Sequence, residues 1–153
     1  LEELKQYFLE GCSDILFQEF ITGDEYGIDI VNDLRRNFVA VFARKKLLMR
    51  DGETAIAEIV DPQPFVQMSK ILSKHFSHQG SIDVDIILSG SDMYVLDINP
   101  RFGGGYPFSH FAGANLPAAL LAWASGDSAD YSYFNPLVGQ ISSKVSSMQL
   151  ISR

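Results

Sequence analysis

The chain has 153 residues, a length that fits a single domain. Hydrophobic residues make up 46% of it and charged residues 20%, which indicates a globular protein and argues against disorder. The formal charge of −7 disfavours nucleic acid binding, and no apolar run reaches the ~20 residues that a membrane span needs. Cys12 is the single cysteine, so no internal disulfide can form, and we expect a reducing, cytoplasmic location.

The N-terminal part predicts a helix followed by a β-hairpin. Residues 1–9 carry apolar side chains at helical spacing and are followed by Gly11, a common helix terminator. Two β-rich runs, 15–21 and 25–31, flank Thr22-Gly23-Asp24, a composition typical of turns. Taken alone, this hairpin fits a plain amphipathic structure with exposed Glu19 and Glu25 better than it fits a binding site.

A long strand with a cationic end follows. It covers residues 38–50 and ends at a predicted turn, Asp51-Gly52. Its second half contains four basic residues, Arg44, Lys45, Lys46 and Arg50. In an acidic chain such a cluster can face an anionic ligand, or it can be a strand edge that lysines protect from aggregation. Both interpretations stay open at this point.

The next segment, residues 65–76, repeats apolar side chains at helical spacing and predicts a second helix. His75 and His78 lie three residues apart at its end. No third ligand lies nearby in the sequence, so we interpret them as ordinary helix-end residues rather than as metal ligands.

A second β-hairpin is predicted from two runs, 80–88 and 93–99, which alternate polar and apolar residues around a turn-like sequence. With an odd number of loop residues, both strands bury one apolar face, and Val84, Ile86 and Leu88 face Ile98, Leu96 and Tyr94, respectively. With an even number, Asp97 would fall on the apolar face as an unpaired charge. We therefore expect an odd loop.

The polar face of this hairpin would bring several oxygen ligands together. In the expected register Asp85 lies opposite Asp97, and Asp83 lies opposite Asn99. Carboxylates within about 5.5 Å repel each other unless a cation joins them, and Mg²⁺ prefers such oxygen ligands. Arg101 follows on the same face, and its guanidinium suits phosphate oxygens. A solvated acidic face is the alternative without a ligand.

The hairpin is followed by three glycines, 103–105, which allow a ligand or another backbone to approach closely. A third helix is predicted from Asn115, a favourable N-cap residue, to Gly126. Residues 140–151 alternate weakly, as in an edge strand or a pair of strands.

The stretch Asp97-Ile-Asn-Pro-Arg-Phe-Gly-Gly-Gly-Tyr-Pro, preceded by Asp85, resembles the ATP-grasp superfamily, most closely its carbamoyl phosphate synthetase large-subunit-like branch. The resemblance runs from Asp14 to Gly126. It implies that Asp85, Asp97 and Asn99 hold Mg²⁺, with Mn²⁺ as an alternative ion, on the phosphates of ATP. It also implies that Arg101 and Asn99 are catalytic residues, with Arg101 stabilising the transferring phosphoryl group.

The same resemblance implies which residues bind the adenosine end of the nucleotide. It implies that Gln18, Glu19, Phe20 and Ile21 form a hinge whose backbone reads the adenine edge. It further implies that Glu25 accepts the ribose hydroxyls and that the basic stretch, with Lys45 as the nucleotide ligand, faces the phosphates. Asp83 stands where relatives often carry an amide, so it is not assigned as a metal ligand.

The fold class that we expect is α+β, with five to seven mostly antiparallel strands and helices over one face, as in an ATP-grasp C-terminal subdomain. We interpret residues 1–153 as the C-terminal half of an ATP-grasp module without its lid and N-terminal substrate domain. The expected partners are a nucleotide and a small-molecule carboxylate, and neither a nucleic acid nor a membrane. Self-association or a partner chain that carries the missing half is also expected.

The implied function is an ATP-dependent carboxylate–amine ligase that works through an acyl phosphate, with this fragment inactive by itself. A non-catalytic nucleotide-binding or subunit-assembly module is the alternative from another class.

Overall fold

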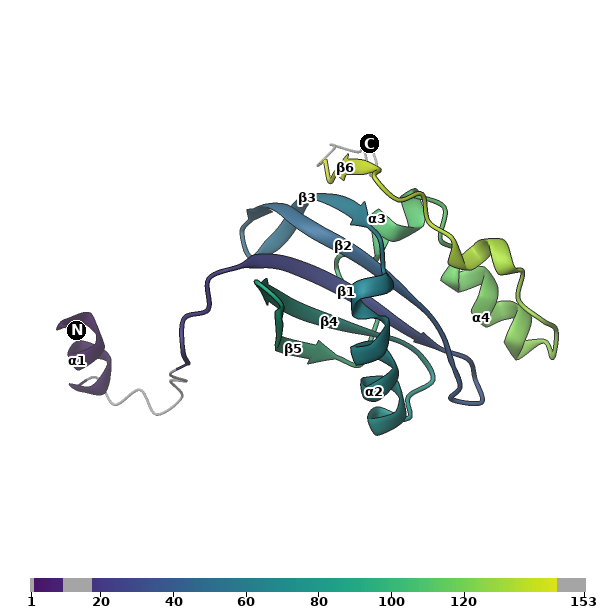
Figure 1. The fold of residues 1–153 in the computed structure, drawn as a ribbon, viewed down its shortest axis with the longest axis horizontal. Coiled ribbons are helices and arrows are strands. Elements are labelled where there is room, and N and C mark those ends of the chain that lie inside the picture. Colours follow the sequence, from purple (N-terminus) through teal and green to yellow (C-terminus); the bar gives the residue numbers. More distant parts are fainter. Residues whose placement is uncertain (1, 10–17, 146–153) are drawn as a thin grey trace, which may run out of the picture.

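The computed structural model describes residues 2–9 and 18–145, which contain one antiparallel sheet (Figure 1). The described strands are β1 (Asp24–Asn32), β2 (Phe38–Arg50), β3 (Glu53–Val60), β4 (Gly80–Ser89), β5 (Asp92–Asn99) and β6 (Ile141–Ser143). Their order across the sheet is β5-β4-β1-β2-β3-β6, and every neighbouring pair is antiparallel. The predicted α+β class is confirmed.

Helices pack on both faces of the sheet, so the prediction of a single covered face is wrong. Helix α2 (Val66–Phe76) packs against the face that contains Ile30, while α3 (Tyr106–Phe111) and α4 (Leu116–Ala124) lie on the face that contains Val31. Ile30 and Val31 are adjacent in β1, so they point to opposite faces, and both are fully buried. Strand β2, which lies near the middle of the sheet, carries a continuous apolar run over residues 38–43 for this reason.

Three predicted helices are present. They are α1 (Glu2–Leu9), α2 and α4, and the Asn115 side chain caps α4 by accepting a hydrogen bond from the backbone N–H of Ala118 at 3.2 Å. Helix α3 was not predicted, because it has six residues and follows directly on the triple glycine. No helix in residues 2–9 and 18–145 is long and apolar enough to cross a membrane.

The first predicted hairpin is wrong in its described part. Residues 18–22 form no strand, and β1 begins at Asp24. Both edges of β1 are occupied, by β4 along residues 24–32 and by β2 along 26–32, so a preceding strand has no edge to pair with. Residues 15–17 lie outside the described part of the chain.

The long basic strand and the tail agree with the prediction. Strand β2 turns into β3 at Asp51-Gly52, where both residues have positive φ angles, 52° and 79°. Aspartate and glycine suit that conformation better than most residues. Strand β6 pairs with the outer edge of β3, and the predicted strand beyond residue 145 falls outside the described residues.

Strands β4 and β5 form the second predicted hairpin, with Asp85 opposite Asp97 and Asp83 opposite Asn99, as expected. The loop, however, is even, because Gly90 and Ser91 alone separate the last pair of the ladder.

The apolar pairing nearer the turn is therefore wrong. Ile86 lies opposite Val95 and Leu88 opposite Met93, instead of Leu96 and Tyr94. The register shifts next to the Asp85–Asp97 pair, where Leu96 is an extra residue in β5. Such a β-bulge reverses the alternation of the strand, so the even loop does not drive Asp97 onto the apolar face.

Candidate functional site

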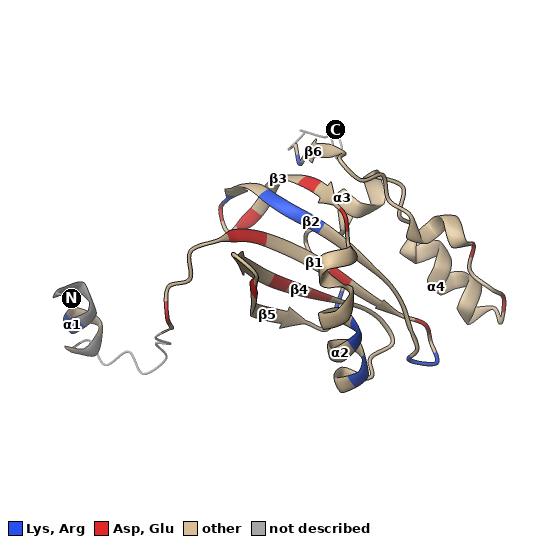
Figure 2. Cartoon of the chain, in the orientation of Figure 1, with Lys and Arg blue, Asp and Glu red and all other residues tan. Residues whose placement is uncertain are grey.

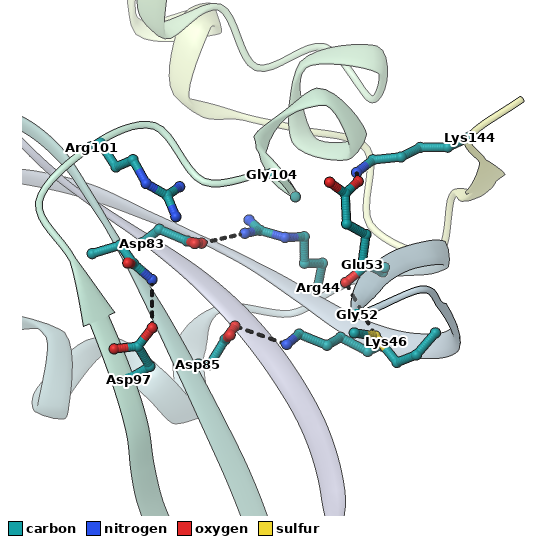
Figure 3. Close-up of a pocket in the computed structure, with 14 residues that line it drawn as sticks. Arg44, Lys46, Gly52, Glu53, Asp83, Asp85, Asp97, Arg101, Gly104 and Lys144 are labelled. Carbon is teal, nitrogen blue, oxygen red and sulfur yellow. Dashed lines mark hydrogen bonds and ion pairs between the residues drawn. The ribbon is translucent and has the colours of Figure 1, made fainter. Parts of the chain in front are cut away.

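Charged side chains surround a cavity of about 340 Å³ at one end of the sheet (Figure 3). Figure 2 shows charged positions on β2, β3 and β4, the strands from which several of these side chains come. The cavity lies on the α3 side, beyond the part of that face that α3 and α4 cover. Its described lining comprises Arg44, Lys46, Met49, Gly52, Glu53, Thr54, Asp83, Asp85, Asp97, Asn99, Arg101, Gly104, Gly105 and Lys144.

The hairpin supplies the acidic wall of the cavity. The Asn99 side-chain amide donates to Asp97 Oδ2 at 2.8 Å, and the backbone N–H of Ile98 donates to Asp97 Oδ1 at 2.9 Å. These bonds orient an exposed carboxylate at the cavity rim. Asp85 lies on the neighbouring strand, directly across from Asp97.

Lys46 joins the hairpin to β1. Its Nζ lies 2.6 Å from Glu25 Oε1 and 2.9 Å from Asp85 Oδ1, and 7% of its side chain is exposed. Burial alone would lower the pKa of Lys46, but hydrogen bonds and charge attraction from Glu25 and Asp85 outweigh burial and raise it. Lys46 is therefore a fixed cation in the floor of the cavity.

Arg44 forms a second, deeper charge cluster with Asp29 and Asp83. Its Nη1 pairs with Asp29 Oδ2, and its Nη2 lies 2.7 Å from Asp83 Oδ1. Ser109 in α3 also donates to Asp29 Oδ2, at 3.3 Å, while the buried Asp29 Oδ1 has no hydrogen-bond partner in the described part of the chain. Burial raises the pKa of both Asp29 and Asp83 against the opposing attraction of Arg44. One buried guanidinium thus ties three strands together.

The triple glycine makes room for this buried cluster. A Cβ on Gly103 would lie 2.2 Å from Asp83 Cγ, and a Cβ on Gly105 would lie 2.0 Å from Arg44 Nε. A Cβ on Gly104 would have Lys144 Nζ as its neighbour, at 4.0 Å. The side chains of Asp83 and Arg44 therefore approach the backbone closely at Gly103 and Gly105, respectively.

Arg101 follows β5 and is exposed. Its Nη1 donates to the backbone oxygen of Phe102 at 2.9 Å, and Figure 3 shows its guanidinium beside Asp83. Attraction from Arg101 also acts to lower the pKa of Asp83, although burial dominates. The structure thus brings Arg101 to the same cavity as Asp85, Asp97 and Asn99.

The residues expected at the adenosine end do not line this cavity. Gln18, Glu19 and Phe20 are exposed and Ile21 is half-buried in the segment that leads into β1. Glu25 reaches the site through its ion pair with Lys46.

Lys45 lies on the opposite face of the sheet, where its Nζ is 2.6 Å from Asp24 Oδ2. Its strand neighbour Tyr26 packs its ring against Phe65, just before α2, and so marks that face. Lys46 therefore occupies the position in the cavity that the resemblance implies for Lys45.

The sequence placed Arg44 in the basic stretch without giving it a role of its own, and Glu53 and Lys144 were missed as cavity residues. Alternation along β2 could have separated Arg44 and Lys46 from Lys45. No comparable signal identifies Lys144, which comes from the far end of the chain and reaches the cavity through the pairing of β6 with β3.

The donor set fits a magnesium ion that is shared with a ligand. Within the described residues, no group of three or more His, Cys, Asp or Glu side chains could hold a metal ion by itself. Asp85, Asp97 and Asn99 offer two carboxylates and one amide oxygen. Mg²⁺ is commonly bound by one or two carboxylates together with substrate phosphates and water, so this small donor set suits a nucleotide-bound ion.

Two solved structures share this fold. N5-carboxyaminoimidazole synthetase from Staphylococcus aureus matches with a TM-score of 0.62 and 14% identity, over 84% of this chain and 37% of that chain. Urea carboxylase from Kluyveromyces lactis matches with a TM-score of 0.56 and 20% identity, over 77% of this chain and 11% of that chain. The described fold is thus one that forms a minor part of longer proteins.

The chain also matches a known protein family. A family described as "ATP-grasp in the biosynthetic pathway with Ter operon" matches residues 11–143, which is most of the chain. The chain belongs to this ATP-grasp family.

Proposed function

We propose that the protein containing this chain is an ATP-dependent ligase and that this chain provides its Mg²⁺–nucleotide site. The observation that carries the proposal is the register that sets Asp85 opposite Asp97 in a cavity shared with Lys46 and Arg101. Adjacent carboxylates next to fixed cations form a site for a metal ion that is itself bound to phosphate.

In this proposal Asp85, Asp97 and the Asn99 amide oxygen hold Mg²⁺. The ion would neutralise charge on the phosphate oxygens and orient them. Arg101 stabilises the charge of the transferred phosphoryl group, because a guanidinium matches phosphate oxygens and the exposed side chain is available to a ligand.

The nucleotide extends from the hairpin towards the start of β1. The backbone of residues 18–21 reads the adenine edge, and Glu25 accepts the ribose hydroxyls while its ion pair with Lys46 links it to Asp85. Lys46, rather than Lys45, is the lysine that faces the phosphates.

The reaction that we propose is ligation of a carboxylate to an amine, as in the carbamoyl phosphate synthetase-like branch. A carboxylate oxygen attacks the γ-phosphorus, ADP leaves, and an acyl phosphate forms. The amine then attacks the acyl carbon, inorganic phosphate leaves, and the nitrogen loses a proton.

Isotope transfer tests the proposal. The protein is incubated with ATP, Mg²⁺ and amines together with candidate carboxylates labelled with ¹⁸O, and the released phosphate is analysed by mass spectrometry. We expect one ¹⁸O atom in each phosphate formed during ligation. Turnover that releases unlabelled phosphate would contradict the acyl phosphate, and nucleotide binding without any turnover would favour the non-catalytic module.

A further inference from the structure

The cavity has a second end, which the nucleotide site does not use. There Lys144, just after β6, pairs with Glu53 at the start of β3, with Nζ 3.1 Å from Oε2 (Figure 3). Glu53, Thr54 and Lys144 also line an adjoining cavity of about 370 Å³. The Glu53–Lys144 pair therefore stands between two hollows of similar size.

This ion pair differs from the two charge clusters at the nucleotide end. Arg44 and Lys46 are almost completely buried, and each contacts two carboxylates. Lys144 and Glu53 have side chains that are 34% and 74% exposed. An exposed pair of this kind contributes little to stability, so it can be exchanged for other partners at low cost.

The surroundings hold both groups in place for such an exchange. The Lys144 ammonium lies 5.7 Å from the centre of the Phe108 ring, a cation–π arrangement that keeps it over α3. Glu53 follows the tight turn at Asp51-Gly52, which fixes where β3 begins. The Thr54 hydroxyl donates to a weak acceptor, Met49 Sδ, at 3.5 Å.

We propose that Glu53 and Lys144 bind the amine substrate of the ligase and that this substrate is an α-amino acid. The inference rests on the proposed ligase function. Glu53 receives the ammonium group, and Lys144 receives the carboxylate, so one zwitterion replaces both halves of the ion pair. The adjoining cavity, with Arg50 and Ala55 in its wall, holds the side chain.

The same arrangement decides which group of the amino acid reacts. A carboxylate paired with the Lys144 ammonium is a poorer nucleophile towards phosphorus, so it is not the carboxylate that receives the phosphoryl group. The Glu53 carboxylate, in contrast, can accept the proton that the ammonium must lose before its nitrogen attacks the acyl phosphate. The bound amino acid therefore acts as the acceptor.

Calorimetry on the protein that contains this chain tests the proposal. Each of the twenty common amino acids is titrated in the presence of Mg²⁺ and β,γ-imido-ATP, followed by the α-amide and the N-acetyl derivative of any that binds. We expect at least one amino acid to bind, and each derivative to bind about tenfold more weakly, since each lacks one charge-assisted contact.

Two variants assign the contacts. Lys144→Met should weaken amino acid binding about tenfold and abolish the discrimination against the α-amide. Glu53→Gln should abolish the discrimination against the N-acetyl derivative. Lys74→Met on α2 and Glu58→Gln on the opposite face of β3 are matched controls and should bind like wild type. All four proteins should bind the nucleotide with unchanged affinity.

These measurements distinguish failure of the amino acid site from failure of the proposed ligase function. If the nucleotide binds and no amino acid does, or if both variants keep the wild-type selectivity, the amino acid site is refuted and the proposed ligase function stands. If the nucleotide does not bind, both the ligase proposal and the inference that rests on it are refuted.

Discussion

Asp85 on β4 lies directly opposite Asp97 on β5, one residue away from the bulge at Leu96. The two carboxylates are compensated differently, because Asp85 pairs with Lys46 while Asp97 is held by the Asn99 amide and a backbone N–H. Among the described residues, Asp97 thus has hydrogen-bond donors and no ion-pair partner at the cavity rim. The relationship explains why this hairpin can receive a cation without a dedicated cage of protein ligands.

Because Arg44 is buried against Gly105, we expect alanine to destabilise the protein more at Gly105 than at Gly104. Gly105→Ala would place a Cβ 2.0 Å from an Nε that two aspartates hold in place, so we expect a loss of about 1–3 kcal/mol in the free energy of unfolding. Gly104→Ala, whose Cβ would meet Lys144 Nζ at 4.0 Å, should remain within about 0.5 kcal/mol of wild type. Urea unfolding of both variants measures this. Equal stability of the two would contradict the described packing.

We expect the half-buried His78 to make the protein less stable at low pH. Burial lowers its pKa, although its ring contact with the Ile30 carbonyl, at 3.1 Å, acts in the opposite direction. The unfolded chain therefore binds the proton more readily. The stability that neutral His78 contributes is fully present above the unfolded pKa of about 6.5 and is lost as the pH falls towards the lowered folded pKa.

We expect His78→Gln to remove part of the decline in unfolding free energy between pH 7 and pH 5, an interval chosen around the histidine pKa of about 6.5. His75→Gln, at an exposed position of α2, serves as the control and should keep the wild-type decline. A steeper decline in His78→Gln would show that the sign of the shift is wrong.

Most helices and strands could be predicted from the sequence, because they depend on local residue patterns. The strand order and the placement of the helices on the sheet could not, because they depend on tertiary contacts. The register of Asp85 with Asp97 was correct although the argument from loop parity was not, since the turn was even and a bulge compensated for it. Helices on both faces were missed, because the adjacent apolar residues Ile30 and Val31 were not interpreted as parts of a core on each side of the sheet. The contribution of Lys144 depends on strand order, which no local pattern encodes.

The two lysines on opposite faces of β2 predict different effects on nucleotide binding. Lys46→Met removes the cation between Glu25 and Asp85, so we expect the dissociation constant of Mg·β,γ-imido-ATP to rise about tenfold or more. Lys45→Met removes only a surface pair with Asp24 and should bind like wild type. Calorimetry distinguishes the two. The reverse order of effects would favour Lys45 as the nucleotide ligand.

If Glu25 accepts the ribose hydroxyls, its removal should weaken ATP binding through the loss of those hydrogen bonds. Glu25→Ala should weaken ATP binding by about 1.5–3 kcal/mol, the usual range for hydrogen bonds to a charged group, without changing the magnesium requirement. A 2′,3′-dideoxy analogue of ATP lacks the same contacts, so the variant and the analogue should not be additive in a double cycle. Full additivity would remove Glu25 from the ribose site.

Titration of Mg·β,γ-imido-ATP into wild type and Asp97→Asn tests the central claim most directly. We expect magnesium-dependent binding by wild type, and at least about tenfold weaker binding by Asp97→Asn with an intact or slightly more stable fold, because one of two facing carboxylates loses its charge. Asp92→Asn at the far end of β5 is the matched control and should bind like wild type. Equal affinity in wild type and Asp97→Asn, with the same magnesium dependence, would contradict the assignment of this hairpin as the metal–nucleotide site.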